Sequence, residues 1–203
     1  MAGHAWFSLF AAGLAFCGSH ILLSSTRLRG SLRDQLGESG YLGVYSLTAL
    51  ATILLVAGYS TPNPPAVGME RRADADDPAP GMLRVTRHPV MWAIGLWGLS
   101  HLVANEDLAS LWFFGAIAAL ALGGTVLIDR KKSLALGSNW QRLASVTSNV
   151  PFAALAARRS QLRLRDIGLL RPIAALLLYA VLYLAHPLFA GVPIVLPWAT
   201  GER

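Results

Sequence analysis

The chain has 203 residues, of which 54% are hydrophobic and 14% charged, and its mean hydropathy is +0.49. This composition excludes an ordinary soluble domain, because the apolar residues form long blocks rather than short amphipathic repeats. The net charge of +6 does not indicate a nucleic-acid partner, because the basic residues lie between apolar blocks, where they act as topology signals and bind anionic lipid headgroups.

Apolar blocks in five places predict helices that cross a membrane. The third block is the shortest, at about 22 Å for a rise of 1.5 Å per residue, against a hydrocarbon core of about 30 Å. We expect it to pair with the fourth block through the Asn105-Glu106-Asp107 turn as a helical hairpin. Pro89, just before the third block, suits the first turn of a helix. The blocks cover about residues 5–23, 41–59, 90–104, 108–128 and 172–189.

The connections between the blocks are polar and of different kinds. Residues 24–40 are basic, and residues 60–87 are rich in Pro, Ala, Asp and Arg, which predicts an irregular surface loop with a short interfacial segment. Residues 146–157 are too short and too interrupted to span, so an interfacial or re-entrant piece is expected. The expected fold is therefore all-α: a polytopic transmembrane helical bundle of about five spans, with a short interfacial helix between spans four and five. It forms one membrane-embedded domain, residues 1–203.

The distribution of Lys and Arg predicts the orientation of this bundle. With the N-terminus inside, most basic residues fall in inner loops, whereas the opposite orientation places most of them outside. The start of the chain also lacks the pattern of a removed signal peptide, so the first block is expected to remain as a span. The expected location is a bacterial inner membrane, multi-pass, with the N-terminus cytoplasmic.

Three histidines then fall at a similar depth near the outer boundary: His20, His101 and His186. Two neutral imidazoles that face each other across a bundle can ligate a haem iron from opposite sides. His20 and His101 are the preferred pair, with His186 or the thiolate of Cys17 as an alternate ligand. Because Cys17 is the single cysteine and there is no CxxCH motif, covalent haem attachment and a disulfide framework are excluded.

Neighbouring residues in the same two blocks fit a flat macrocycle. Gly13 and Gly98 can leave room for the ring. Phe16 and Trp97 each precede a histidine by four residues, so each shares a helix face with it and can pack on the ring edge.

Other interpretations of these residues remain open. A membrane histidine often hydrogen-bonds between helices, and glycines often simply let helices approach. A zinc site from three histidines is conceivable, but no intramembrane carboxylate supports it. At the inner side, Arg84, Arg87 and His88 gather at the head of the third block. They either bind an anionic headgroup or cofactor, or simply start a helix at the interface.

Residues 81–107 (GMLRVTRHPVMWAIGLWGLSHLVANED), 19–29 (SHILLSSTRLR) and 147–155 (TSNVPFAAL) together resemble the NnrU family of bacterial membrane proteins. The resemblance covers nearly the whole chain and implies a link to denitrification, that is, to nitrite and nitric oxide reduction. The family includes the cis-zeta-carotene isomerase of plants and cyanobacteria, a membrane protein with a non-covalent haem b. Its axial histidines correspond to His20 and His101. It has a cysteine, a proposed exchangeable ligand, where this chain has Gly98.

The resemblance implies an inner-membrane, bis-histidine haem b protein that handles nitric oxide or electrons, or assists nitrogen-oxide reductase components. One alternative is a haem-dependent cis-trans isomerase of a polyene or carotenoid-like lipid that enters from the bilayer. A further alternative is a non-catalytic assembly protein whose basic loop binds lipid or partner subunits. The RHP at residues 87–89 is also similar to a helix start in isoprenylcysteine carboxyl methyltransferases, but only over a few residues.

Overall fold

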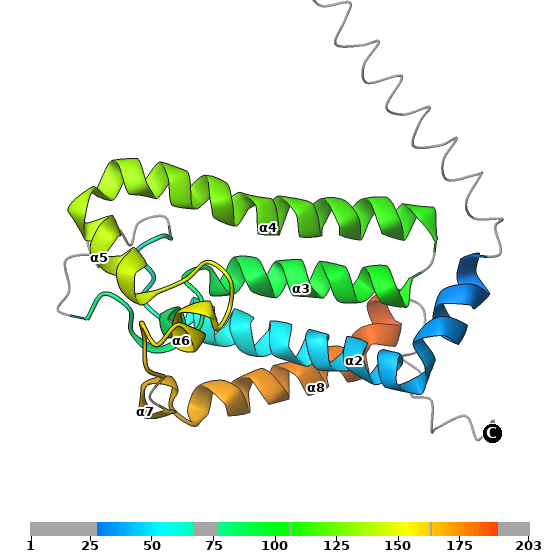
Figure 1. Ribbon diagram of the computed structural model, residues 1–203. Helices are drawn as coiled ribbons and strands as arrows, with labels where there is room; N and C mark the ends of the chain where they lie inside the picture. Colours follow the sequence, from blue (N-terminus) through cyan, green and yellow to red (C-terminus); the bar gives the residue numbers. More distant parts are fainter. Residues whose placement is uncertain (1–27, 67–76, 106, 163, 191–203) are drawn as a thin grey trace, which may run out of the picture.

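A computed structural model of the chain describes residues 28–66, 77–105, 107–162 and 164–190, and all regular structure in this part is helical (Figure 1). The all-α prediction is therefore confirmed for these residues. The elements are α2 (Leu28–Tyr59), the 3₁₀ helix η2 (Gly81–Arg84), α3 (Pro89–Ala104), α4 (Leu108–Leu136), α5 (Ser138–Val146), α6 (Ala153–Ala156), α7 (Leu164–Ile167) and α8 (Leu170–Ala190).

The four longest of these helices lie side by side in the order α4, α3, α2, α8 (Figure 1). α3 packs on both α2 and α4, and α2 also packs on α8. Neighbouring helices run in opposite directions, so the row has two distinct ends. One is the hairpin end, where residues 105–107 connect α3 to α4. The other is the cap end, where η2, α5, α6 and α7 gather around the end of α2 and the starts of α3 and α8 (Figure 1).

The α3–α4 hairpin forms as the sequence predicts. Pro89 occupies the first turn of α3, where its missing N–H is not needed. Asp107 is the N-cap of α4, and its carboxylate accepts hydrogen bonds from the Ser110 backbone N–H at 2.9 Å and the Ser110 hydroxyl at 2.6 Å. The helices then approach closely at Gly98, where an added Cβ would lie 3.0 Å from the Phe114 carbonyl oxygen and 3.2 Å from Ala118 Cβ.

The span count is confirmed only in part. Two helices are long and apolar enough to cross a membrane, Leu108–Leu136 and Leu170–Leu188, and only 17% and 6% of their most apolar windows are buried. Low burial distinguishes them from the core helices of a soluble protein, whose apolar residues are inside. Apolar helices Ser46–Tyr59 and Pro89–Ala104 are shorter, and the expected span at residues 5–23 lies outside the described residues. Five spans therefore remain a prediction.

Two boundaries differ from those expected. α4 continues for eight residues past the predicted end at residue 128, through the charged Asp129-Arg130-Lys131-Lys132 segment. The connection expected at residues 24–40 is helical from Leu28 onward and belongs to α2, with a break at Gly37. Gly37 has φ 58° and ψ −173°, a conformation that glycine adopts without steric cost, so the chain changes direction there.

The cap end is closed by two apolar clusters that share the η2 region. Met82 and Val85 pack with Leu54 and Ala57 of α2, whereas Leu83 packs with residues of α5. The second cluster consists of Ala79, Leu83, Trp140 and Leu143, with Leu136, Ala144 and Val146 against it. η2 is thereby held between the helix row and α5. η2 lies within residues 60–87 and α6 within residues 146–157, the two stretches where interfacial segments are expected. A position of either at a membrane interface stays a prediction.

The close approach of α3 and α4 at Gly98 predicts how a larger side chain at this position would affect stability. Replacing Gly98 with Leu should lower the free energy of unfolding by about 1–3 kcal/mol, because the new side chain meets the α4 backbone, which cannot move aside cheaply. The matched control is Gly123→Ala on α4, where an added Cβ meets nothing within 4 Å. That variant should be neutral or up to about 1 kcal/mol more stable. Unfolding in detergent micelles measures both, and equal losses would contradict the close approach.

The Asp107 cap predicts a pH dependence. The Ser110 hydroxyl donates to this carboxylate and holds the pKa of Asp107 below its ordinary value of 3.8. A depressed carboxyl pKa contributes stability above the unfolded-state value, and this contribution is lost as the pH falls through the folded-state value. Wild type should therefore lose hairpin stability below about pH 4 relative to Asp107→Asn, which still caps the helix but does not titrate. Parallel unfolding curves at acid pH would refute this.

Candidate functional site

The His101 cluster at the hairpin end consists of His101, Trp97 and Phe114. The His101 and Trp97 ring centroids are 4.6 Å apart, as their four-residue spacing on α3 predicts. Phe114 of α4 packs against both rings. Its ring centroid lies 4.7 Å from that of His101 and 5.2 Å from that of Trp97. The three rings therefore pack in mutual contact, and the imidazole is held by one aromatic ring from each of the two helices.

One hydrogen bond sets the tautomer of His101. Its Nδ1 lies 2.9 Å from the Trp97 carbonyl oxygen. A carbonyl oxygen only accepts, so Nδ1 carries the hydrogen and, in the neutral ring, Nε2 has the bare lone pair. This is the arrangement in which an imidazole binds a metal through Nε2 while a backbone carbonyl orients the ring.

His186 of α8 lies at the same end of the row. The side chains of His186 and His101 are both half-buried. α3 and α8 both end at the hairpin end, so His101 and His186 lie toward the same end of the helix row (Figure 1). A shared depth in a membrane stays a prediction. His20, Cys17, Phe16 and Gly13 lie outside the described residues, and their assigned roles remain predictions.

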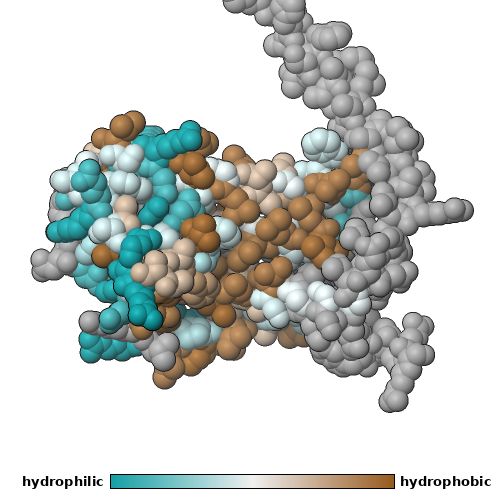
Figure 2. Space-filling view, in the orientation of Figure 1, coloured by the Kyte–Doolittle hydropathy of each residue, from teal (hydrophilic) through white to brown (hydrophobic). Residues whose placement is uncertain are grey.

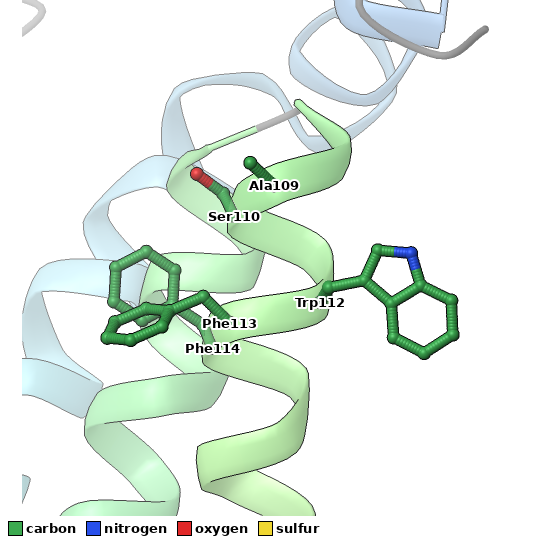
Figure 3. A pocket seen from close by; sticks show the side chains of 5 residues that line it. All are labelled: Ala109, Ser110, Trp112, Phe113 and Phe114. Carbon is green, nitrogen blue, oxygen red and sulfur yellow. The ribbon is translucent and has the colours of Figure 1, made fainter. Parts of the chain in front are cut away.

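An open apolar groove of about 500 Å³ lies at the first turns of α4, next to the His101 cluster. Phe113 and Phe114 project from one side of α4, and Trp112 projects away from them (Figure 3). Phe114 is thus both a wall of the groove and a direct neighbour of the imidazole. The described residues that line it are Ala109, Ser110, Trp112, Phe113 and Phe114.

Gly98 does not open a space beside His101. The position that a Cβ would take there is bordered by the Phe114 carbonyl and Ala118, so α4 itself fills the room that the sequence assigned to a macrocycle. Gly98 serves the close approach of α3 and α4, which was the alternative interpretation of the membrane glycines. Any flat ligand of His101 must approach from the exposed side, where Trp97 is 36% exposed.

A second cluster, the Asp129 cluster, lies at the cap end and consists of Arg87, His88, Asp129 and Asn149. His88 Nε2 lies 2.6 Å from Asp129 Oδ1. Arg87 Nε lies 3.1 Å from both carboxylate oxygens, and its Nη2 lies 3.0 Å from Oδ2. The side chains of Arg87 and Asp129 are 14% and 19% exposed, and that of His88 only 2%. Asp129 therefore compensates a buried guanidinium and fixes the start of α3 against the late turns of α4.

Asn149 connects the loop after α5 to the same carboxylate. Its Nδ2 donates to Thr125 Oγ1 at 2.9 Å and lies 3.5 Å from Asp129 Oδ2, while its Oδ1 accepts from Trp92 Nε1 at 3.3 Å. The backbone continues this connection, because the Arg87 N–H donates to the Ser148 carbonyl at 3.0 Å. The loop is thus bound to both α3 and α4 through satisfied polar groups.

Arg84, Arg87 and His88 were expected at the inner surface as a site for an anion. In the structure the His88 residue is 3% exposed, and the Asp129 carboxylate takes the place of an external anion for Arg87 and His88. Arg84 Nη2 is 2.6 Å from the Asp77 carboxylate. Sequence reasoning did not identify Asp129 or Asn149. The available signal was a carboxylate at the end of an apolar helix, where an ionised side chain requires a partner.

Among the described residues, no group of three or more His, Cys, Asp or Glu side chains could hold a metal ion by itself. In this part of the chain, the histidine oriented by a backbone carbonyl and two aromatic rings is His101, and it is the residue that would hold a haem iron. His186, the alternate named from the sequence, lies on α8, which ends at the same end of the helix row.

The NnrU protein family matches the chain over residues 8–67 and 47–194. The "15-cis-zeta-carotene isomerase, chloroplastic" of Arabidopsis thaliana and that of Zea mays are each 30% identical to it over 129 residues. Each match covers 58% of this chain and 33% of the relative, so the chain spans about a third of the length of these relatives. No solved structure gives a significant match.

The Asp129 cluster predicts a large stability effect. Asp129→Ala should lower the free energy of unfolding by about 3–5 kcal/mol, because it leaves the Arg87 guanidinium buried without its counterion. The matched control is Asp77→Ala, which removes a bridge of similar geometry to Arg84 in which the carboxylate is 51% exposed. That loss should be the smaller of the two, because the Asp77 carboxylate is half exposed and pairs with one basic side chain, whereas Asp129 pairs with two. Detergent unfolding curves compare the two, and similar losses would contradict a structural role for Asp129.

Proposed function

The chain belongs to the NnrU family, and on this basis we propose that it is a membrane-embedded cis-trans isomerase of a polyene or carotenoid-like lipid. Two helices long and apolar enough to span, together with the family, indicate a membrane protein, so its substrate can be dissolved in the bilayer. The relatives with this named activity are 30% identical to the chain over 129 residues, and the chain spans about a third of their length.

The observation that carries the proposal is the position of the groove against His101. Phe114 forms a wall of the groove and lies 4.7 Å from the imidazole, so an apolar chain in the groove would pass close to this ring. Trp112 and Phe113 are 57% and 60% exposed, and the groove that they line lies at the hairpin end, away from the polar cap end. A lipid can therefore enter laterally without crossing water.

Haem b is the proposed cofactor, and His101 and His20 would hold its iron. The Trp97 carbonyl holds His101 in the tautomer that such ligation requires, and Trp97 and Phe114 restrict the rotation of the ring. When bound there, a haem would supply a redox-active iron beside the groove. His186 is the alternate second ligand.

The same histidine supports the second candidate, an NnrU-type haem b protein that handles nitric oxide or electrons, alone or with nitrogen-oxide reductase components. That function requires the axial ligands but no site for a long apolar molecule. The exposed apolar groove beside the imidazole favours the isomerase. Substitutions in the groove that leave the histidines intact therefore separate the two functions.

The experiment pairs a groove variant with a matched surface variant. Phe113→Gln places a polar amide in the groove and should lower kcat/KM for 15-cis-zeta-carotene under reducing, anaerobic conditions by about tenfold, because apolar contact with the substrate is lost. Leu120→Gln on the same helix, at a 77% exposed apolar position outside the groove lining, should leave it unchanged. Neither change should alter the absorption spectrum. Absence of isomerisation by wild type would refute the proposal.

The cofactor is tested separately by absorption spectra of the purified protein, oxidised and then dithionite-reduced. Wild type should show a Soret band, and His101→Ala should weaken or shift it as one axial ligand is removed. The control His101→Met retains a ligand atom for iron and should keep the band at a shifted position. A wild-type protein without the band, or a spectrum indifferent to His101→Ala, would reject haem ligation here.

A further inference from the structure

We propose that the cap end carries a binding surface for anionic phospholipid headgroups, formed by Arg130, Lys131 and Arg158 with the apolar side chains of Val150 and Phe152. This headgroup surface is independent of the chemistry at the hairpin end. It also differs from the anion site that the sequence assigned to Arg84, Arg87 and His88.

The basic residues of the cap end fall into two groups: those that pair with a carboxylate and those exposed at the surface. Asp129 pairs with Arg87 inside, and Asp77 pairs with Arg84, so these carboxylates compensate those arginines. The side chains of Arg130, Lys131 and Arg158 are exposed. Between residues 108 and 171 the sequence contains nine Lys and Arg residues but two carboxylates, Asp129 and Asp166. Because Asp129 is paired with Arg87, a positive excess remains in this part of the chain.

The length of α4 places these cations at the level of lipid headgroups. Its 29 residues extend about 43 Å, whereas a hydrocarbon core measures about 30 Å. If the apolar span begins at Leu108, the helix leaves the hydrocarbon near residue 128. Arg130 and Lys131 then follow directly in the headgroup layer, where negative phosphates attract them. Figure 2 shows the corresponding change from a hydrophobic belt over the helices to hydrophilic residues at the cap end.

Two residues beside α6 are held in an unusual backbone conformation. Phe152 (φ 65°) and Arg158 (φ 55°) are the non-glycine residues with positive φ in the described part of the chain, and they flank the one-turn helix α6. Such a conformation costs roughly 1–2 kcal/mol for an ordinary L-residue. The Phe152 N–H donates to the Val85 carbonyl at 2.8 Å, which holds the turn in place. The result is an exposed aromatic ring and an exposed guanidinium at opposite ends of one short turn.

The two apolar side chains of the headgroup surface, Val150 and Phe152, indicate that its partner is a lipid surface. Val150 is 58% exposed and Phe152 is 49% exposed, both in the segment just before α6 at the cap end. In water, the exposed apolar surface of these two side chains would cost free energy. At a membrane interface they enter the acyl boundary while the neighbouring Arg and Lys side chains contact phosphates. A nucleic acid would match the cations but not the exposed apolar side chains.

The test uses the full chain purified in detergent and equilibrated with mixed micelles containing equal amounts of phosphatidylglycerol and phosphatidylcholine. After gel filtration, the lipid retained per protein is measured by mass spectrometry. Wild type should retain phosphatidylglycerol preferentially. Replacing Arg130, Lys131 and Arg158 together by Gln should lower this preference by about fivefold for each charge removed. The control Arg130→Lys, Lys131→Arg, Arg158→Lys keeps the charges and should keep the preference.

The apolar contribution is tested at Phe152. Asn tolerates positive φ, so Phe152→Asn should preserve the turn while reducing retention of both lipids, whereas Phe152→Trp should retain them. A salt titration of wild type provides a readout that needs no variant, because screening should release phosphatidylglycerol as ionic strength rises. Equal retention of both lipids by wild type, retention insensitive to salt, or an unchanged preference in the folded triple Gln variant would overturn the proposal.

Discussion

The Asp129 carboxylate and its two basic partners are the constraint on which the rest of the arrangement depends. A carboxylate near the end of an apolar helix is costly unless it is paired and hydrogen-bonded, and Arg87 and His88 meet that requirement at 2.6–3.1 Å. Because these partners immediately precede α3, the pairing fixes the position of α3 along α4. Asn149 then attaches the loop after α5 to the same point, so the cap end is one connected polar structure.

With the cap end fixed, the contacts at the hairpin end follow from the packing of α3 on α4. Gly98 allows the backbones to approach, and this approach brings Phe114 against His101 and Trp97. The same packing removes the space beside Gly98 and leaves the apolar groove on the outer side of α4. The hydrogen bond from His101 to the Trp97 carbonyl then sets which ring nitrogen can act as a ligand or base.

The two ends of the molecule therefore have different physical characters. The hairpin end combines an oriented imidazole with aromatic rings and an open apolar surface, which suits chemistry on a molecule dissolved in the bilayer. The cap end combines internal ion pairs with external cations, which suits attachment to an anionic membrane surface. Thirteen positions along α3 separate His88 from His101, about 20 Å at 1.5 Å per residue, so the two histidines cannot act on one ligand.

The sequence by itself determined the helical class, the α3–α4 hairpin, Pro89 in the first turn of α3 and the shared face of Trp97 and His101. These features depend on local spacing and on turn chemistry. Only the tertiary structure decided that Asp129 pairs with His88, 41 residues away, that α4 fills the space beside Gly98, and that α4 continues past residue 128. The reason is physical: such contacts depend on the rotation and axial position of one helix against another, which no local pattern specifies.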